Sequence, residues 1–289
     1  MMNGFIAENW KLNLLGHPIE DSYTISSDIE AIAVADGVTR DPTPYLPDKS
    51  TLAGKLKFVL SYEKPSRAKR AADDFTEVSP ELLREYKIKD HNAIRQVFEL
   101  ANNTIAKRSQ IDTPNPDYLT NDFPGCVAAL TSYFDGAIHW GFICDCGLSV
   151  IDEKGNIKFR TLDEGPSKID EQIWPKIREK LGRNINWRMP AARREIRSIY
   201  RNNPQEINSY GVLTGEEAAM HYVRTGFYEA KPSDTLLVYS DGISELMFNK
   251  DGDIKSEFAS KIKVKDFKGL EKMCKKQVHS EGTLVCHIK

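Results

Sequence analysis

The sequence predicts an α+β fold in which mostly antiparallel β-sheet is covered on its outside by helices. Three observations predict it. Short stretches rich in β-branched and aromatic residues occur near both ends of the chain and in its middle. A long helical stretch separates the first group of strands from the second, and Asp135-Gly136 forms a two-residue turn between two apolar strands. Strands, then helices, then strands again, joined by hairpins instead of regular βαβ alternation, are typical of this class.

The strands are expected in three groups. The first group covers residues 5–13, 21–27 and 30–36, and the second covers 124–134, 137–145, 147–151 and 156–160. The third group covers residues 234–240 and 282–288. The turn at Asp135-Gly136 joins 124–134 to 137–145, because Asp and Gly tolerate the positive φ values that such a turn requires.

Helices are expected near 66–109 and from Thr214 to Gly226. In the first stretch a single apolar stripe at helical spacing comprises Ile94, Val97, Phe98, Ala101 and Ile105. The second begins with a capping-box pattern at Thr214-Gly-Glu-Glu217 and ends at Gly226. No hinge, low-complexity tract or internal repeat divides the chain, so we expect a single domain over residues 1–289.

Composition excludes several classes of protein. The chain of 289 residues carries 40 Lys+Arg against 42 Asp+Glu, which removes the electrostatic case for nucleic acid or an anionic membrane as the main partner. No apolar run approaches the roughly 20 residues of a membrane span. The first twenty residues have no apolar signal core, so the cytoplasm is the expected location. The five cysteines include no CxxC pair, which argues against a disulfide framework.

Most catalytic signatures are absent from the sequence. It contains no G-x-x-x-x-G-K, G-x-G-x-x-G, H-E-x-x-H or G-x-S-x-G motif, and no cysteine is followed by arginine at the spacing of a cysteine-phosphatase loop. Cys144-Asp-Cys146 suggests zinc only if Cys286 and His287 complete four ligands. The simpler interpretation is two small buried residues in a strand.

Carboxylates stand where apolar strands end. Ala31-Ile-Ala-Val-Ala35 runs into Asp36-Gly37, and Leu236-Leu-Val-Tyr-Ser240 runs into Asp241-Gly242. A carboxylate at the end of a buried strand is costly unless a cation compensates it, and a neighbouring glycine lets backbone approach closely. Oxygen-only ligands suit Mg²⁺ or Mn²⁺.

Three further acidic positions fit this pattern. Glu20-Asp21 opens one strand, Asp145 closes another and Glu281 begins the last strand of the chain. The competing interpretation is that Asp-Gly is a common turn dipeptide, and two of the four Asp-Gly pairs, at 135 and 251, are most simply turns. The order of the whole set favours a metal site.

Taken in order, these residues resemble the motifs of the PPM family, the metal-dependent protein phosphatases of the 2C class. The matches, spread from residue 20 to 283, are Glu20-Asp21, Val34-Ala-Asp-Gly37, Gly125-Cys126, Asp145, Tyr239-Ser-Asp-Gly-Ile243 and Glu281-Gly-Thr283. The resemblance implies a four-layer αββα sandwich of two mainly antiparallel sheets flanked by helices. It also implies a helical or loop-rich flap insertion at about 163–230.

The resemblance further implies a phosphatase that hydrolyses phosphoserine and phosphothreonine in proteins. Two Mn²⁺ or Mg²⁺ ions would share a bridging water that attacks phosphorus directly. Asp36 would bridge the ions, the Gly37 carbonyl would bind one, and Asp241 with Glu281 would hold the other. Glu20 and Asp21 would act through water, and Asp145 would complete an optional third site.

The sequence departs from the family pattern at the phosphate-binding position. The family's arginine, five residues before the early aspartate, falls on Gly16. Arg40, three residues after Gly37, is the candidate replacement, because a guanidinium can hold two phosphoryl oxygens. A surface arginine after a turn is the alternative. His17 is a further candidate, as a ligand or an acid. Glu281 stands where the family has Asp.

Two other functions stay open beside the protein phosphatase. One is a pseudophosphatase that binds a partner without turnover, favoured by the missing arginine, and the other is a hydrolase of small phosphoesters. An arginine-rich segment at 183–201 could recruit phosphoprotein by charge, and the spacing of 193, 197 and 201 places three arginines on one helical face. A solvated helix face is the alternative.

Overall fold

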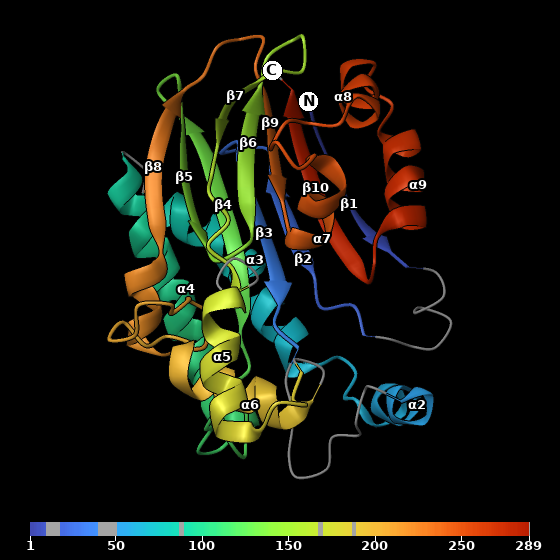
Figure 1. Ribbon diagram of the computed structural model, residues 1–289. Coiled ribbons are helices and arrows are strands. Elements are labelled where there is room, and N and C mark those ends of the chain that lie inside the picture. The colour runs from blue at the N-terminus through green and yellow to red at the C-terminus, as the bar shows by residue number, and fades with distance from the viewer. Residues whose placement is uncertain (10–17, 40–50, 87–89, 167–169, 187–188, 289) are drawn as a thin grey trace.

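The computed structural model describes residues 1–9, 18–39, 51–86, 90–166, 170–186 and 189–288. Two antiparallel five-stranded sheets form its centre (Figure 1). The first sheet has the order β1 (Met2–Glu8), β10 (Glu281–Ile288), β9 (Thr235–Tyr239), β6 (Gly147–Ile151) and β7 (Ile157–Arg160). The second has the order β2 (Ser22–Ser26), β3 (Ala31–Gly37), β4 (Cys126–Phe134), β5 (Ala137–Ile143) and β8 (Arg224–Glu229).

Helices cover the outer face of each sheet. The second sheet packs against α3 (Arg67–Tyr86) and α4 (His91–Asp112). The first sheet is covered by α7 (Asp241–Met247), α8 (Ser256–Lys263) and α9 (Phe267–Gln277). The predicted αββα sandwich is therefore confirmed.

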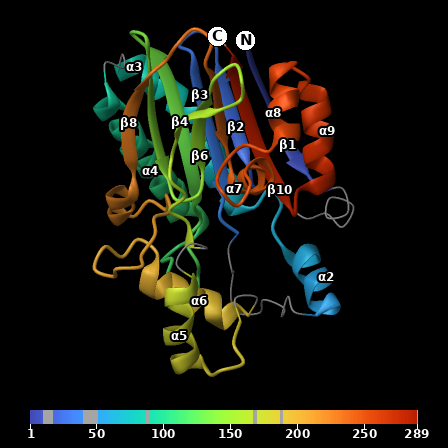
Figure 2. The same cartoon turned by 45° about the horizontal axis from the view of Figure 1, so that its top comes forward.

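Three more helices lie beyond one end of the sheets. They are α2 (Leu52–Ser61), α5 (Asp170–Leu181) and α6 (Pro190–Tyr200), and Figure 2 shows them projecting from the sandwich. The last two fall within the insertion expected at about 163–230. That range also contains β8, which pairs with β5 and is part of the second sheet.

The main core fills the space between the sheets and beneath α3 and α4. Residues 31–35 of β3 are all buried, which explains why this strand is apolar without alternation: one face meets the other sheet and the other face meets α3. Phe75 of α3 and Phe98 of α4 are fully buried with their ring centroids 5.0 Å apart. Truncating a buried phenylalanine of this kind to alanine costs about 3–5 kcal/mol.

Eight of the nine predicted strands are present within two residues of their expected bounds. The first, expected at 5–13, is β1 at Met2–Glu8, and residues 10–13 of that prediction lie outside the described residues. One predicted helix is wrong. The helix expected from Thr214 to Gly226 is a short 3₁₀ helix, η2 (Glu217–Tyr222), followed by strand β8. Thr214 donates its hydroxyl to the Glu216 carboxylate over 2.7 Å instead of capping an α-helix. Pairing of β8 with β5 satisfies backbone groups that the helix would otherwise have satisfied, so tertiary pairing overrides the local pattern.

The hairpin turn and the cysteines agree with the sequence analysis. The Asp135-Gly136 turn is confirmed, with φ of 49° at Asp135 and 80° at Gly136. All five cysteines are buried and free, so no disulfide framework exists. Within the described ranges, none of the helices combines the length and the apolar character needed to span a bilayer.

Candidate active site

Five carboxylates gather at one end of the sandwich, and we call them the acidic cluster. They come from both sheets, and the charges of the other four raise the pKa of Asp36. The members are Asp21, Asp36, Asp145, Asp241 and Glu281. The structure thus brings together five acids that lie up to 260 residues apart in the chain, as the sequence pattern predicts.

The second sheet positions the first two members. Ser22 of β2 pairs with Ala35 of β3, so Asp21 and Asp36 are the next residues at the same end of these two strands. Asp145 lies in the short connection between β5 and β6, where the chain passes from the second sheet to the first. This connection carries Cys144 at φ 70°. The turn therefore places Asp145 between the two sheets.

The first sheet supplies the other two members. Asp241 begins α7 directly after β9, and Glu281 begins β10. A Cβ atom on Gly242 would lie 1.9 Å from the Glu281 carbonyl oxygen. Only glycine allows this contact, so the Asp-Gly pattern at 241–242 reflects close packing of α7 against the start of β10.

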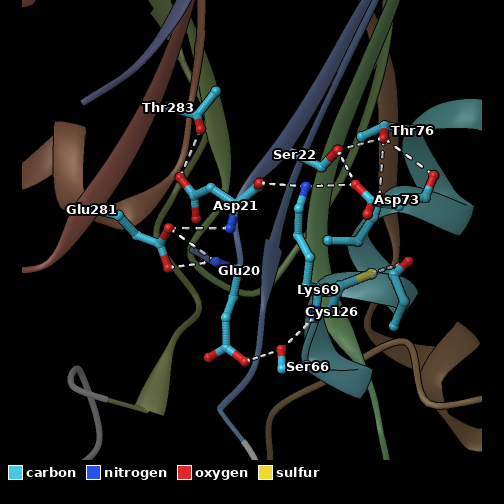
Figure 3. Close-up of polar contacts among 12 residues, drawn as sticks. Glu20, Asp21, Ser22, Ser66, Lys69, Asp73, Thr76, Cys126, Glu281 and Thr283 are labelled. Carbon is cyan, nitrogen blue, oxygen red and sulfur yellow. Dashed lines mark hydrogen bonds and ion pairs between the residues drawn. The ribbon is translucent and has the colours of Figure 1, made fainter. Parts of the chain in front are cut away.

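Asp21 is held by hydroxyl groups from the opposite sheet. Its Oδ2 accepts a hydrogen bond from Thr283 Oγ1 at 2.7 Å (Figure 3). The same oxygen accepts a second hydrogen bond from Ser240 Oγ at 2.8 Å. Ser240 Oγ in turn accepts the Thr283 backbone N–H at 2.9 Å. The Asp21 Oδ1 atom is buried without a hydrogen-bond partner, which leaves a carboxylate oxygen available to a cation.

Glu281 and Glu20 make contacts that the sequence does not reveal. Both carboxylate oxygens of Glu281 accept the Glu20 backbone N–H, at 2.9 and 3.0 Å, and one also accepts the Asp21 N–H at 3.3 Å. The Glu20 side chain points away from Asp21 in Figure 3. It accepts hydrogen bonds from the hydroxyls of Thr39, Tyr62 and Ser66. Glu20 therefore supports the acidic cluster through its backbone.

Burial and mutual repulsion raise the pKa values of the acidic cluster. Burial is the largest cause for every member. It raises the pKa of Asp21 to about 6, helped by Asp241 and opposed by the Thr283 and Ser240 hydrogen bonds. With Asp241 nearby the pKa of Asp145 reaches about 8, and with Asp21 nearby that of Glu281 reaches about 9. The pKa of Asp36 lies well above its usual range.

These carboxylates fit divalent cations in their donor chemistry. Burial is the main cause that raises the pKa of Asp36, and the charges of Asp21 and Asp241 raise it further, so the metal-free cluster retains protons. A bound cation would replace those protons and release the repulsion. As they stand, no three His, Cys, Asp or Glu side chains in the described ranges enclose a point where an ion could sit.

The predicted phosphate-binding residues lie outside the described residues. Arg40, His17 and the position of the family's arginine, Gly16, all fall in the gaps at 10–17 and 40–50. Thr39 is described and lies next to Arg40 in the chain, and its hydroxyl donates to Glu20 Oε2 over 2.6 Å. Thr39 therefore lies beside the Glu20 side chain.

Two arginines of the segment at 183–201 are buried, so the structure does not support this segment as a docking face for phosphoprotein. Arg197 and Arg201 are 7% and 4% exposed, and both pair with the buried carboxylate of Asp122. Arg197 also donates to the backbone oxygen of Thr39 over 2.9 Å. Arg193 and Arg197 lie in α6 and Arg201 is its C-cap residue, so the two arginines at the end of this stripe point inward.

Asp163 is a further acid that the sequence pattern did not single out. It raises the pKa of Asp145 and of Asp241 by its charge, so it lies beside the acidic cluster. Its Oδ1 accepts the Gly165 N–H at 2.8 Å, and a Cβ on Gly165 would lie 2.8 Å from Asp145 Oδ2. The available signal was an acid shortly after a strand, but Glu164 separates it from Gly165, unlike the direct Asp-Gly pair at Asp36.

Comparison with known structures identifies the fold. The catalytic domain of the serine/threonine phosphatase PstP, crystallised with two manganese ions, covers 100% of this chain with 98% of its own, at a TM-score of 0.56 and 12% identity. The PPM phosphatase MsPP from Mycobacterium smegmatis, in complex with cacodylate, matches at 0.54 and 13% identity over 99% of this chain and 97% of its own. This chain has the PPM phosphatase fold.

The photosystem II phosphatase PBCP shows the same PPM fold, with a TM-score of 0.54 and 13% identity over 100% of this chain and 98% of that chain. No family model and no curated protein matches the sequence. Since identities of this size carry the fold alone, the chemistry must be argued from the acidic cluster, which lies where the two sheets of the PPM fold meet.

Proposed function

We propose that this protein is a Mn²⁺- or Mg²⁺-dependent phosphatase acting on phosphoserine and phosphothreonine in proteins. The observation that carries the proposal is the acidic cluster: five carboxylates gathered at the end of a PPM-type sandwich, where burial above all, with neighbouring charge, raises their pKa values. Such a cluster is costly without cations and is suited to hold two of them. Cations bound there would neutralise phosphoryl oxygens and lower the pKa of a water for direct attack on phosphorus.

Different residues of the chain would bind the cations and the phosphoryl group. Asp36 would bridge the two cations with the Gly37 carbonyl beside it, and Asp241 would hold one of them. Ser240 and Thr283 fix one oxygen of Asp21 and leave the other for the site. Arg40 would bind the phosphoryl oxygens through its guanidinium group.

The remaining carboxylates would act around this pair of cations. Glu20 would contribute through water, Glu281 would approach a cation from β10, and Asp145 with the neighbouring Asp163 would serve an optional third site. No side-chain nucleophile is needed. Burial raises the pKa of all five cysteine thiols, which makes each a poor nucleophile.

A second candidate is a binding module that keeps the fold without turnover. The specific observation in its favour is that both oxygens of Glu281 already accept backbone N–H groups of residues 20 and 21. A cation would have to compete with these hydrogen bonds. Together with Gly16 at the family's arginine position, this would weaken catalysis.

One assay separates the candidates. Hydrolysis of p-nitrophenyl phosphate and of a phosphothreonine peptide would be compared in Mn²⁺, with and without EDTA, using Asp36→Asn as the matched inactive control. EDTA-sensitive hydrolysis that favours the peptide supports the protein phosphatase. Preference for the small ester points to a phosphoesterase. Manganese binding without turnover of either substrate points to the binding module.

A further inference from the structure

A pocket lies at the end of the second sheet that is opposite the acidic cluster. It has a volume of about 510 Å³ and is formed around the β4–β5 turn, the start of α4 and the end of β8. Val127 of β4 pairs with Asp36, and Phe134, which lines this pocket, lies seven residues further along the strand. At about 3.3 Å per residue this places the pocket roughly 23 Å from the acidic cluster. We call it the aromatic pocket.

Four rings form the wall of the aromatic pocket. Phe227 of β8 lies directly opposite His139 of β5 in the sheet, and their ring centroids are 6.3 Å apart. Phe134 lies 6.5 Å from His139 on one side, and His91 lies 6.3 Å from Phe227 on the other. Phe134 is 46% exposed and Phe227 is 55% exposed, so both present an open ring surface. A cation within about 6 Å of such a ring is attracted by its electron-rich face.

The charged groups lining the aromatic pocket are acidic. Asp90, Asp135 and Glu229 line it, and no described lining residue is Lys or Arg. Asp90 is partly engaged, because its side chain caps α4 by accepting the backbone N–H groups of residues 92 and 93. Asp135 at the hairpin turn and Glu229 at the end of β8 supply the remaining negative charge. This combination of aromatic surface and carboxylates is complementary to an organic cation.

His139 contributes a ring without a positive charge. Its Nδ1 atom is buried without a hydrogen-bond partner, and a protonated imidazole would leave an unsatisfied N–H donor there. Burial lowers the pKa of His139, and the nearby His91 acts in the same direction. The neutral ring therefore does not repel a cation at neutral pH.

We propose that the aromatic pocket binds a primary alkylammonium group, such as the end of a lysine side chain or of a polyamine. The rings contact the alkyl chain and the ammonium charge, and Asp135 with Glu229 accept its N–H groups. A quaternary ammonium has no N–H to donate, so a primary amine is preferred. This site is separate from the acidic cluster and does not depend on the proposed phosphatase activity.

The test is a ligand-detected NMR titration of the full chain with n-pentylammonium. Saturable millimolar binding is expected, with 1-pentanol and tetramethylammonium at least fivefold weaker. Phe227→Ala should weaken binding at least fivefold and Asp135→Asn at least threefold. Asparagine tolerates the positive φ at this turn, so the hairpin is kept. Titrations with cadaverine and with an acetyl-Ala-Lys-Ala-amide peptide then distinguish a free amine from a protein lysine.

Matched controls come from the same chain. Tyr86→Ala removes a 40% exposed aromatic ring from the end of α3, and Asp251→Asn changes an exposed Asp-Gly turn elsewhere. Both should leave the affinity within twofold of the parent. The proposal is overturned if n-pentylammonium does not saturate, if 1-pentanol or tetramethylammonium binds as well, or if the pocket variants bind like the controls.

Discussion

The guanidinium of Arg197 donates a hydrogen bond to the backbone oxygen of Thr39 over 2.9 Å. The same guanidinium pairs with buried Asp122, and the Thr39 hydroxyl donates to Glu20 at 2.6 Å. Helix α6 is therefore connected through Arg197 and Thr39 to Glu20. The backbone N–H of Glu20 in turn donates to Glu281. Arg197, one of the arginines that could have faced a partner, instead holds the backbone of Thr39 in place.

Replacing Asp122 tests this buried connection. Asp122→Ala should destabilise the protein by about 3–5 kcal/mol, because Arg197 and Arg201 would remain buried without their counter-charge. Urea unfolding of parent and variant measures the difference. The exposed Asp251→Ala should change stability by less than about 0.5 kcal/mol. A loss below about 1 kcal/mol for Asp122→Ala would show that solvent compensates these arginines.

Asp36→Asn and Asp241→Asn test the metal assignment. Each should reduce Mn²⁺ affinity at least tenfold while the protein stays folded, because a ligand charge is removed from a crowded acidic site. The metal-free variants should be at least as stable as the parent, since one repelling carboxylate is gone. Calorimetric titration with Mn²⁺ gives the affinity. Asp135→Asn, in an Asp-Gly turn far from the acidic cluster, is the control; parent-like binding by both cluster variants would refute the assignment.

Stability of the metal-free protein should depend on pH in a specific direction. Folding raises the pKa of Asp21 to about 6, of Asp145 to about 8 and of Glu281 to about 9, so the folded state holds protons that the unfolded state has lost. Their stabilising contribution is complete below about pH 4 and disappears as pH rises through the folded values. Urea unfolding in EDTA should show stability falling between pH 5 and 9 for this reason.

Magnesium should reverse that trend. Cations compete with protons for the same carboxylates, so saturating Mg²⁺ should stabilise the protein more at pH 8 than at pH 5. Asp145→Asn should flatten the metal-free profile near pH 8 and leave the rest unchanged. A metal-free protein whose stability rises steadily up to pH 9 would contradict the raised pKa values.

Arg40→Ala tests the replacement of the family's phosphate-binding arginine. If Arg40 holds the phosphoryl group, losing a charge-assisted contact should cost about 1.5–3 kcal/mol in the transition state. This corresponds to a roughly ten- to more than hundredfold drop in kcat/KM. Manganese affinity should stay within about twofold, because arginine is not a ligand. An unchanged kcat/KM would leave His17, the arginine-rich segment at 183–201 and Lys11, a basic residue near His17 in the sequence, as candidates for phosphate binding.

Local sequence was sufficient for much of the site. Asp36 and Asp241 could be predicted because each follows a buried strand and precedes a glycine that close packing requires, as at Gly242 against Glu281. Asp163 was not found, because it stands three residues beyond its strand and is followed by Glu164 instead of glycine. The inward direction of Arg197 was not found either, because its helical spacing is the same whether the face meets solvent or Asp122.

The sequence by itself determined the mostly antiparallel α+β fold, the hairpin at Asp135-Gly136 and the identity of the acids, because strand periodicity, turn residues and burial cost are encoded within short segments. The two-sheet sandwich was implied by the resemblance of the ordered motifs to the PPM family. Only the tertiary structure decided which groups satisfy those acids. Ser240 and Thr283 reach Asp21 from the opposite sheet, and the N–H groups of Glu20 and Asp21 occupy Glu281. These contacts join residues more than 200 positions apart, so they depend on how the sheets pack and no local pattern specifies them.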